Sequence, residues 1–280
     1  MTEAPKDYLE KGNALLDTGD YQGAIQCYEK ALGLDPKYAL AWGNKGNALD
    51  NLGRHEEAIK SYEKAIELDQ RFALVWSDKG VALGKLGRYG EAITCFDKAL
   101  EIEPKLALAW NNKGLALEYL GRLEEAIPCY DKALGLDPKH IAAWYNKGVA
   151  LDRLGRYEEA IPCYNKALGL DPKLTLAWKN KGAMLLFGLY LYKEAITCFD
   201  KALELDPKNA LVWVYKGNAL DKVGRDEEAI TCFDKALELD PKNAEAWYLK
   251  GGALVNLGRN EEANICYDKA RELGLELAPR

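Results

Sequence analysis

Tryptophan recurs along this chain at a fixed interval. Each of the seven tryptophans lies 34 residues after the one before, except for one step of 35 residues. The series is Trp42, Trp76, Trp110, Trp144, Trp178, Trp213 and Trp247, and Tyr8 holds the same position one interval earlier. A period of this length is typical of stacked repeats, in which each unit buries its apolar face only against its neighbours. The sequence therefore predicts eight copies of one structural unit and a function that resides on a surface.

Other residue types are fixed within the same period. When the Trp is counted as position four, position eight is always Gly, positions 20 and 27 are always Ala, and position 24 is Tyr or Phe. Five units close with Asp-Pro. This pattern resembles the tetratricopeptide repeat (TPR) over roughly residues 5–277. The resemblance implies an all-α solenoid, a right-handed superhelix of eight helix-turn-helix units in one domain. The expected repeats are residues 5–38, 39–72, 73–106, 107–140, 141–174, 175–209, 210–243 and 244–277.

The residues of one unit also predict two helices by themselves. From Trp42 to Leu52, small and apolar residues recur every three or four positions, which indicates a helix. Gly53 is expected to end it, because glycine is favoured just past a helix end. The pair Glu56-Glu57 suits the first turn of a second helix, where negative charge meets the positive end of the helix dipole. Each unit is therefore predicted to be a helical hairpin, with Gly and Ala where the two backbones approach closely.

Composition and charge argue against several classes of partner. Apolar residues make up 48% of the chain and charged residues 29%, enough for a folded core without a disordered tract. The net charge is −6 and there is no block of Lys or Arg, so nucleic acid is not expected to bind. No apolar run is long enough to cross a membrane, and the N-terminus lacks the layout of a signal peptide. We expect a cytoplasmic protein without a membrane partner.

The cysteines share one position in the repeat. One Cys per unit places neighbours about 10 Å apart, the usual separation of packed helices, which is too far for a disulfide or a shared zinc ion. The predicted role is structural, as a small side chain half-buried in the stack, and no metal is expected. The seven are Cys27, Cys95, Cys129, Cys163, Cys198, Cys232 and Cys266, and Ser61 holds this position in the second unit.

Signals of catalysis are weak. The two histidines, His55 and His140, are far apart in the array, and neither is followed by a nucleophile or carboxylate at a helical spacing. Glu-Glu pairs recur in nearly every unit, so they are better interpreted as helix-start residues than as a catalytic pair. No glycine-rich phosphate loop is present. We expect a protein that is not an enzyme and has no cofactor.

Position seven, commonly Leu in the TPR pattern, is Lys in all eight units. One interpretation is that the stem of each Lys packs on the aromatic residues while its amine reaches helix-end carbonyls or an acid such as Asp97 or Asp131. The alternative is a ladder of cations that binds an anionic ligand.

The TPR resemblance also implies a binding face. In that family the concave face is lined by the first helix, mainly at positions 2, 5, 9, 12 and 13. Carried over, these positions give a candidate peptide-binding groove of Leu108, Asn111, Leu115, Tyr119, Tyr145, Val149, Arg153 and Lys179. The implied function is a protein-interaction scaffold that binds a peptide or an amphipathic helix with apolar anchors. The leucines at position two could instead pack against the preceding unit.

One TPR subclass does not match. TPR domains that clamp the C-terminal carboxylate of heat-shock chaperones combine Lys at position five with Asn at position nine. Here Asn47 fills position nine, but Gly43 stands at position five of the same unit. Repeat six has Lys179 at position five, but its position nine is Ala183 and not Asn. Binding of chaperone tails is therefore not expected.

The sixth unit departs from the others by one extra residue and by a stretch, residues 184–192, without any charge. An exposed apolar turn of this kind indicates a contact site, with Phe187, Leu189, Tyr190 and Leu191 as its residues. The alternative is a longer first helix whose extra turn is covered by units five and seven. A contact here would make the chain a self-assembling structural protein, a homo-oligomer, which is the second candidate function.

The eighth unit carries polar residues where the others are apolar. Position 21 is Ile in seven units and Asn264 in the eighth, and position 28 becomes Arg271. Because the two lie seven residues apart on one helix face, we expect them to form the polar outer face that ends the array.

Overall fold

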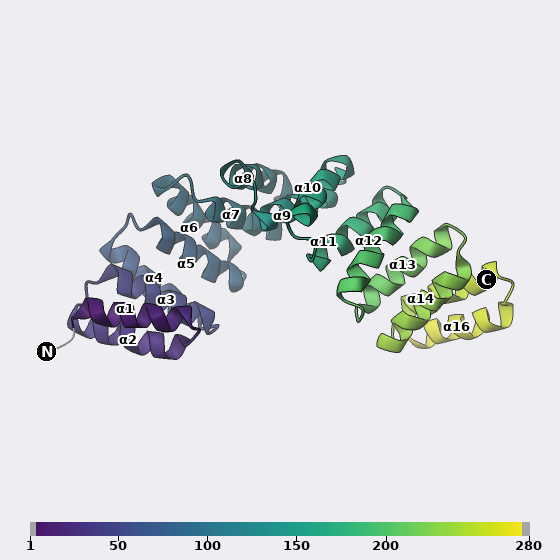
Figure 1. Ribbon diagram of the computed structural model, residues 1–280, viewed down its shortest axis with the longest axis horizontal. Coiled ribbons are helices and arrows are strands. Elements are labelled where there is room, and N and C mark those ends of the chain that lie inside the picture. Colours follow the sequence, from purple (N-terminus) through teal and green to yellow (C-terminus); the bar gives the residue numbers. More distant parts are fainter. Residues whose placement is uncertain (1–3, 276–280) are drawn as a thin grey trace. The chain divides into compact units, whose positions relative to one another are not determined.

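The computed structural model describes residues 4–275, which hold sixteen α-helices, one π-helical turn and no β-strand. The all-α prediction is confirmed, and Figure 1 shows the helices following one another as hairpins. The chain forms two compact units that divide between Ala150 and Leu151, inside α9. In residues 4–275, no helix has both the length and the apolar character that crossing a membrane requires.

The first unit contains the helices α1 (Pro5–Asp17), α2 (Tyr21–Leu34), α3 (Ala39–Asn51), α4 (His55–Leu68), α5 (Ala73–Lys85), α6 (Tyr89–Ile102), α7 (Ala107–Tyr119), α8 (Leu123–Leu136) and most of α9 (Ile141–Arg153). The second contains α10 (Tyr157–Leu170), α11 (Thr175–Ala183), the π-helical turn η1 (Met184–Gly188), α12 (Tyr192–Leu205), α13 (Ala210–Lys222), α14 (Asp226–Leu239), α15 (Ala244–Asn256) and α16 (Asn260–Glu272). In every repeat the odd-numbered helix is the first helix and the even-numbered helix is the second. In repeat six the π-helical turn η1 follows the first helix, α11, and α12 is the second helix.

The turn inside a repeat depends on one glycine. Gly53 follows α3 with φ of 75°, a left-handed conformation that L side chains rarely adopt. The next residue, Arg54, precedes α4 and donates two hydrogen bonds of 2.7 Å to the carboxylate of Glu57 in the first turn of that helix. The same Arg–Glu pair recurs in most repeats, as at Arg88–Glu91 and in repeat eight. This turn holds the two helices of a repeat side by side.

The two helices of a repeat cross where glycine faces an aromatic ring. A Cβ atom added to Gly114 in α7 would lie 2.7 Å from Cε1 of Tyr130 in α8, closer than carbon atoms pack. Tyr130 is fully buried, and so are Ala126 and Ala133 one helical turn to either side of it. The predicted close approach of the backbones at Gly and Ala is therefore confirmed, and the aromatic ring fills the space that the glycine leaves.

Tryptophan and lysine connect each repeat to the one before. Trp110 Nε1 donates a hydrogen bond of 2.9 Å to the carbonyl oxygen of Pro104, which closes the turn between repeats three and four. Lys113 lies with its amine 5.5 Å from the centre of the Trp110 ring and 2.5 Å from Asp97 Oδ1 in the preceding repeat. The interpretation that the lysines pack on aromatic rings and reach acids is confirmed, because these amines are engaged inside the array.

The aspartate of the Asp-Pro pairs has a role that the sequence did not predict. Asp137 Oδ1 accepts a hydrogen bond of 3.0 Å from the backbone N–H of Lys139, across Pro138. The same bond forms in repeat one, from Lys37 N to Asp35 Oδ1. A short side chain that accepts from the backbone two residues later stabilises a turn. The helix therefore ends at Asp-Pro for two reasons, since Pro cannot continue the helix and Asp holds the turn that follows.

The cysteines lie in the stack as predicted, but most of them are more deeply buried than the predicted half-burial. All seven are free thiols, and every one except the half-buried Cys27 is buried. Burial raises the pKa of Cys95 to about 11, so its thiol stays protonated near neutral pH. A protonated and buried thiol is a poor nucleophile, which agrees with a structural role.

The polar substitutions of the eighth repeat lie on the surface. Ile230 and Leu237 of α14 are buried, whereas Asn264 and Arg271, at the same repeat positions on α16, are exposed.

Two adjacent glycines in α15 provide a matched test of the crossing. A Cβ at Gly251 would lie 2.6 Å from Cε1 of Tyr267, whereas a Cβ at Gly252 meets no heavy atom within 4 Å. We predict that Gly251→Ala lowers the free energy of unfolding by about 1–2 kcal/mol because the ring must move. Gly252→Ala should raise it by about 0.5–1 kcal/mol, because Ala is the better helix former.

Urea unfolding followed by circular dichroism measures both variants against the wild type. Equal effects of the two substitutions would contradict a close contact between Gly251 and the Tyr267 ring at the helix crossing.

Candidate functional site

The first helices of the repeats form one continuous surface in the first unit, which we call the helix-A face. It comprises α1, α3, α5 and α7, in which successive helices contact each other directly. The part of α9 that ends at Ala150 continues it, since Asn146 is hydrogen-bonded to Asn111 of α7. Two of the predicted groove residues in α7 project from it, since Leu108 is 65% exposed and Tyr119 is 63% exposed. Leu115 lies between them and is half-buried.

The predicted groove residues divide between the two compact units. Tyr145 and Val149 lie in the part of α9 that belongs to the first unit, and both are half-buried. Arg153, exposed at the end of α9, and Lys179, half-buried in α11, belong to the second unit. The candidate site that can be built within one unit is therefore the one in the first unit.

Asn111 lies beneath this surface. Its side chain is only 4% exposed. Asn111 Oδ1 accepts a hydrogen bond of 3.1 Å from Asn146 Nδ2, and its Nδ2 donates one of 3.1 Å to Asn112 Oδ1. Both ends of the amide are thus used within the protein. Asn111 therefore joins α7 to α9 through Asn146, a role that repeat position alone does not reveal.

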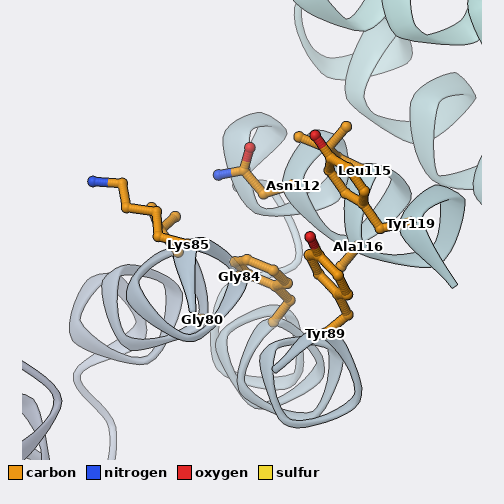
Figure 2. Close-up of a pocket in the computed structure, with 10 residues that line it drawn as sticks. Gly80, Gly84, Lys85, Tyr89, Asn112, Leu115, Ala116 and Tyr119 are labelled. Carbon is orange, nitrogen blue, oxygen red and sulfur yellow. The ribbon is translucent and has the colours of Figure 1, made fainter. Parts of the chain in front are cut away.

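The helix-A face is hollowed beside Gly84. A pocket of about 420 Å³ opens there between α5, α6 and α7. Its lining consists of Gly80, Val81, Gly84, Lys85, Tyr89, Phe96, Asn112, Leu115, Ala116 and Tyr119. Figure 2 shows Tyr89 and Tyr119 on one side of the pocket, with Lys85 and Asn112 turning their nitrogen atoms toward the other side.

The pocket exists because Gly84 lacks a side chain. Gly84 stands at position twelve of repeat three, and a Cβ atom there would meet no heavy atom within 4 Å. Every other repeat has a side chain at this position. These residues are Leu16, Asp50, Glu118, Asp152, Leu186, Asp221 and Val255. The missing side chain at position twelve of repeat three therefore leaves space for the pocket.

Two tyrosines form one wall of the pocket. Tyr89 begins α6 and Tyr119 ends α7, and their rings stack with centroids 4.7 Å apart and planes 5° from parallel. Tyr119 is one of the predicted groove residues. Tyr89 is not, because the family pattern assigns the face to first helices alone, whereas Tyr89 starts a second helix. The aromatic residue at position 17 of repeat three is the sequence feature from which Tyr89 could have been predicted as a site residue.

A charged cluster lies next to the pocket. Asp50 Oδ1 lies 2.7 Å from His55 Nδ1, and Asp50 Oδ2 accepts a hydrogen bond of 2.7 Å from Lys85 Nζ. The expectation from the sequence concerned only residues that follow each histidine, whereas the carboxylate that His55 meets precedes it. The sequence does not suggest the pair, because Asp50 precedes His55 and belongs to the other helix of the hairpin. Since Asp50 also accepts a hydrogen bond from Lys85, the three side chains form one polar network that joins α3, α4 and α5.

Asp78 is a second acidic residue on this face, in α5. Burial raises the pKa of its carboxyl to about 6, a hydrogen bond with Asn47 opposes that rise, and the nearby charge of Asp50 adds to it. A carboxyl group that holds its proton up to pH 6 can donate a hydrogen bond in mildly acidic solution. Asp78 shares a small polar pocket with Asn47, Asp50 and Tyr62.

The leucines at position two project from the surface. The side chains are between 39% and 65% exposed, so each offers part of its surface to solvent. They are Leu40, Leu74, Leu108, Leu176 and Leu211.

The charge-free residues 184–192, which we call the unit-six segment, contain the π-helical turn η1. The extra residue of this repeat is absorbed there, and Leu189 N donates a hydrogen bond of 3.2 Å to the carbonyl oxygen of Met184, five residues earlier. Gly188 lies against the ring of Tyr157 in the preceding repeat, where a Cβ atom would be 2.8 Å from Cζ. The insertion is thus packed against its neighbour by a specific contact.

The unit-six segment is partly core and partly surface. Met184, Leu185 and Leu186 are buried, as the longer-helix alternative expects. Phe187, Tyr190 and Leu191 are exposed, as the contact alternative expects, and Leu189 is half-buried. Tyr190 occupies the place of the turn glycine with φ of 57°, a strained conformation for a residue with a side chain.

Asp78 predicts a dependence of stability on pH. Its pKa is higher in the folded protein than the ordinary value of 3.8, so the native state binds the proton more tightly than the unfolded chain does. The free energy of unfolding should therefore fall as pH rises from about 4 to about 6, by on the order of 2 kcal/mol from this group. Asp78→Asn should remove that decrease. Urea unfolding of both proteins at pH 4, 5, 6 and 7 measures it, and parallel pH profiles would contradict the assignment.

Models of known protein families match most of the chain. A tetratricopeptide repeat model matches residues 9–71, 77–141 and 113–174, which together cover more than half of it. Further models of the same repeat match residues 198–231, 217–258, 180–209 and 244–273. A search of curated proteins returned no match.

Solved structures agree with this assignment. A crystal structure of MamA is 28% identical over 58% of this chain and 95% of its own, with a TM-score of 0.54. MamA from Desulfovibrio magneticus RS-1 is 27% identical over 60% of this chain and 94% of its own, with a TM-score of 0.57. A chain of the APC/C hetero-tetramer Cut9–Hcn1 shares the fold at a TM-score of 0.67 and 20% identity, over 88% of this chain and 48% of its own. The fixed columns, the helical hairpins and these matches agree, and the chain belongs to the tetratricopeptide repeat family.

Proposed function

We propose that this protein is a non-catalytic interaction scaffold that binds a peptide or helical segment of a partner on the helix-A face of its first unit. The observation that carries the proposal is the pocket beside Gly84, because it lies on the face that the family pattern predicts and is lined by Leu115 and Tyr119. Membership of a repeat family that generally acts through protein contacts supports the scaffold role and argues against catalysis.

The surroundings of the pocket favour a peptide over other ligands. Exposed apolar side chains such as Leu74, Leu108 and Tyr119 offer anchoring area, while the amide of Asn111 is satisfied within the protein. Buried aromatic and aliphatic anchors supply most of the affinity of such contacts. The net charge of −6 argues against nucleic acid. Gly43 at position five argues against the chaperone-tail clamp.

Removal of two anchors should weaken binding without unfolding the chain. We predict that Tyr119→Ala with Tyr145→Ala weakens the best peptide selected on the wild-type protein by more than tenfold, because a central aromatic anchor is worth about 2 kcal/mol or more. Fluorescence anisotropy with a labelled peptide measures the affinity, and circular dichroism checks the helical content. Tyr248→Ala is the matched control, since Tyr248 has the same repeat position as Tyr145 but lies in the second unit. Unchanged affinity in the double variant would refute the proposed location.

A second candidate function is self-association through the unit-six segment. It is favoured by the exposure of Phe187, Tyr190 and Leu191 next to one another in a turn that is polar in the other repeats. Tyr190 is 65% exposed and its backbone is strained, a combination that folding stability alone does not require. In this second candidate function, the binding partner is another copy of the same chain.

Restoring the common turn should separate association from folding. We predict that Tyr190→Gly with Leu191→Arg abolishes any dimer, and raises the free energy of unfolding by about 1–2 kcal/mol because glycine adopts the left-handed conformation freely. Light scattering coupled to gel filtration measures association. Leu205→Arg at the other end of α12 is the control, since Leu205 and Leu191 are equally exposed, at 40% and 42%. A wild-type monomer at high concentration, or a dimer that survives the double change, rules this candidate out.

A further inference from the structure

We infer that the pocket beside Gly84 is the anchor point of the helix-A face, and that it takes one large aromatic side chain of a partner peptide with a carboxylate close beside it. The inference rests on the proposed peptide-binding function and specifies the chemistry of its ligand.

The size of the pocket fits one large side chain. Its volume of about 420 Å³ lies toward the lower end of the range of ligand sites, about 300–1,000 Å³. One aromatic side chain with a short stretch of its backbone fits a space of this size, whereas a whole helix needs a long groove. The pocket therefore binds one residue of a ligand, and the remaining contacts lie on the exposed side chains around it.

The walls favour a flat, aromatic occupant. The ring of Phe96 lies beneath Gly80, and the stacked rings of Tyr89 and Tyr119 form one side. Val81 and Leu115 complete the apolar lining. Aromatic rings gain from offset or edge-to-face contact with other rings beyond the area that they bury. A partner residue such as Trp or Phe can make such contacts with the two tyrosine rings, above a floor that the buried Phe96 closes.

The rim supplies hydrogen-bond donors. On the side away from the tyrosines, Asn112 turns its nitrogen atom outward and the Lys85 side chain extends farther in the same direction, with its amine beyond the lining (Figure 2). Asp50 takes one of the three donors of the Lys85 ammonium, and the Lys85 side chain is 45% exposed. Asn112 Oδ1 already accepts from Asn111, which fixes the orientation of the amide. A carboxylate adjacent to the aromatic residue, from Asp or Glu, would accept from this rim.

The charges nearby are consistent with an acidic neighbour. Asp50 has both carboxylate oxygens engaged, one with Lys85 and the other with His55. Burial raises the pKa of Asp78, which lessens its negative charge at mildly acidic pH. A basic residue at the same place would meet the Lys85 ammonium, whereas an acidic one completes a charge-assisted hydrogen bond.

Gly84 allows the pocket to be filled without strain. Gly84 lies in α5, its φ is not in the left-handed region, and the space where its Cβ would stand is open. Gly84→Leu should therefore occupy the pocket with its own side chain while the helix keeps or gains stability. Gly252→Leu is the matched control, because Gly252 is an equally open glycine in a first helix of the second unit.

The experiment selects ligands from a random peptide library displayed on phage, using the full-length protein. Synthetic copies of the selected peptides are then titrated by fluorescence anisotropy. We expect them to share an aromatic residue within two positions of an Asp or Glu. Alanine in place of that aromatic residue, or Gly84→Leu in the protein, should weaken binding at least about tenfold. Gly252→Leu should bind as the wild type does, and Lys85→Met should remove the preference for the acidic neighbour.

Two failures are distinguishable. If Gly84→Leu binds the selected peptides with wild-type affinity while the Tyr119→Ala, Tyr145→Ala variant does not, the anchor inference is overturned and the proposed function stands. If no selected peptide depends on either tyrosine, the proposed function itself fails. Should Gly84→Leu lower the melting temperature, the alanine-substituted peptides decide the question, since the protein is then unchanged. Selected peptides without an aromatic residue would also overturn the inference.

Discussion

The contact of a glycine with an aromatic ring, where the two helices of a repeat cross, is the interaction on which the rest of this structure depends. At Gly114 and Tyr130, as at Gly217 and Phe233, the ring occupies the space in which a Cβ would stand. The backbones can approach only because the glycine has no side chain, and the ring then seals the gap. Flanking alanines such as Ala126 are fully buried for the same reason. The hairpins that lie within one compact unit are thereby held in the same geometry.

Contacts between repeats depend on polar groups as well as on packing. The Trp indole donates to the carbonyl of the closing turn, and the Lys beside it reaches an acid of the preceding repeat, as at Lys147 and Asp131. The bonds to acids neutralise lysine side chains that would otherwise project from the array as unpaired cations. In repeat six the lysine Lys181 meets Asn165, an amide in place of an acid, and the contact persists at 2.7 Å. The lysine column is therefore part of the scaffold, and the ligand chemistry must come from other positions.

Functional candidates in this chain lie where a repeat departs from the common pattern. Gly84 removes a side chain that the other repeats carry and opens a pocket. The insertion in repeat six moves the turn glycine away, so Tyr190 adopts a left-handed conformation and exposes its ring. Each departure has a local cost, which is lost helix propensity at Gly84 and backbone strain at Tyr190. Local rules are commonly broken in this way at sites kept for function.

The sequence by itself determined the repeat, the two helices of each unit and the burial of its glycine, alanine and aromatic columns. These follow from spacing, because helical periodicity fixes which residues share a face. It also identified Leu115 and Tyr119, since family positions translate directly into positions on a helix. Asn111 shows the limit of that translation, because its side chain is buried and hydrogen-bonded to Asn146 of α9, a contact between two helices that the pattern of one helix does not reveal. Only the tertiary structure brought Tyr89 to Tyr119 and His55 to Asp50, since each pair joins two different helices. The pocket beside Gly84 belongs to the same class, because an empty space is defined by the side chains that surround it and not by the residue that leaves it open.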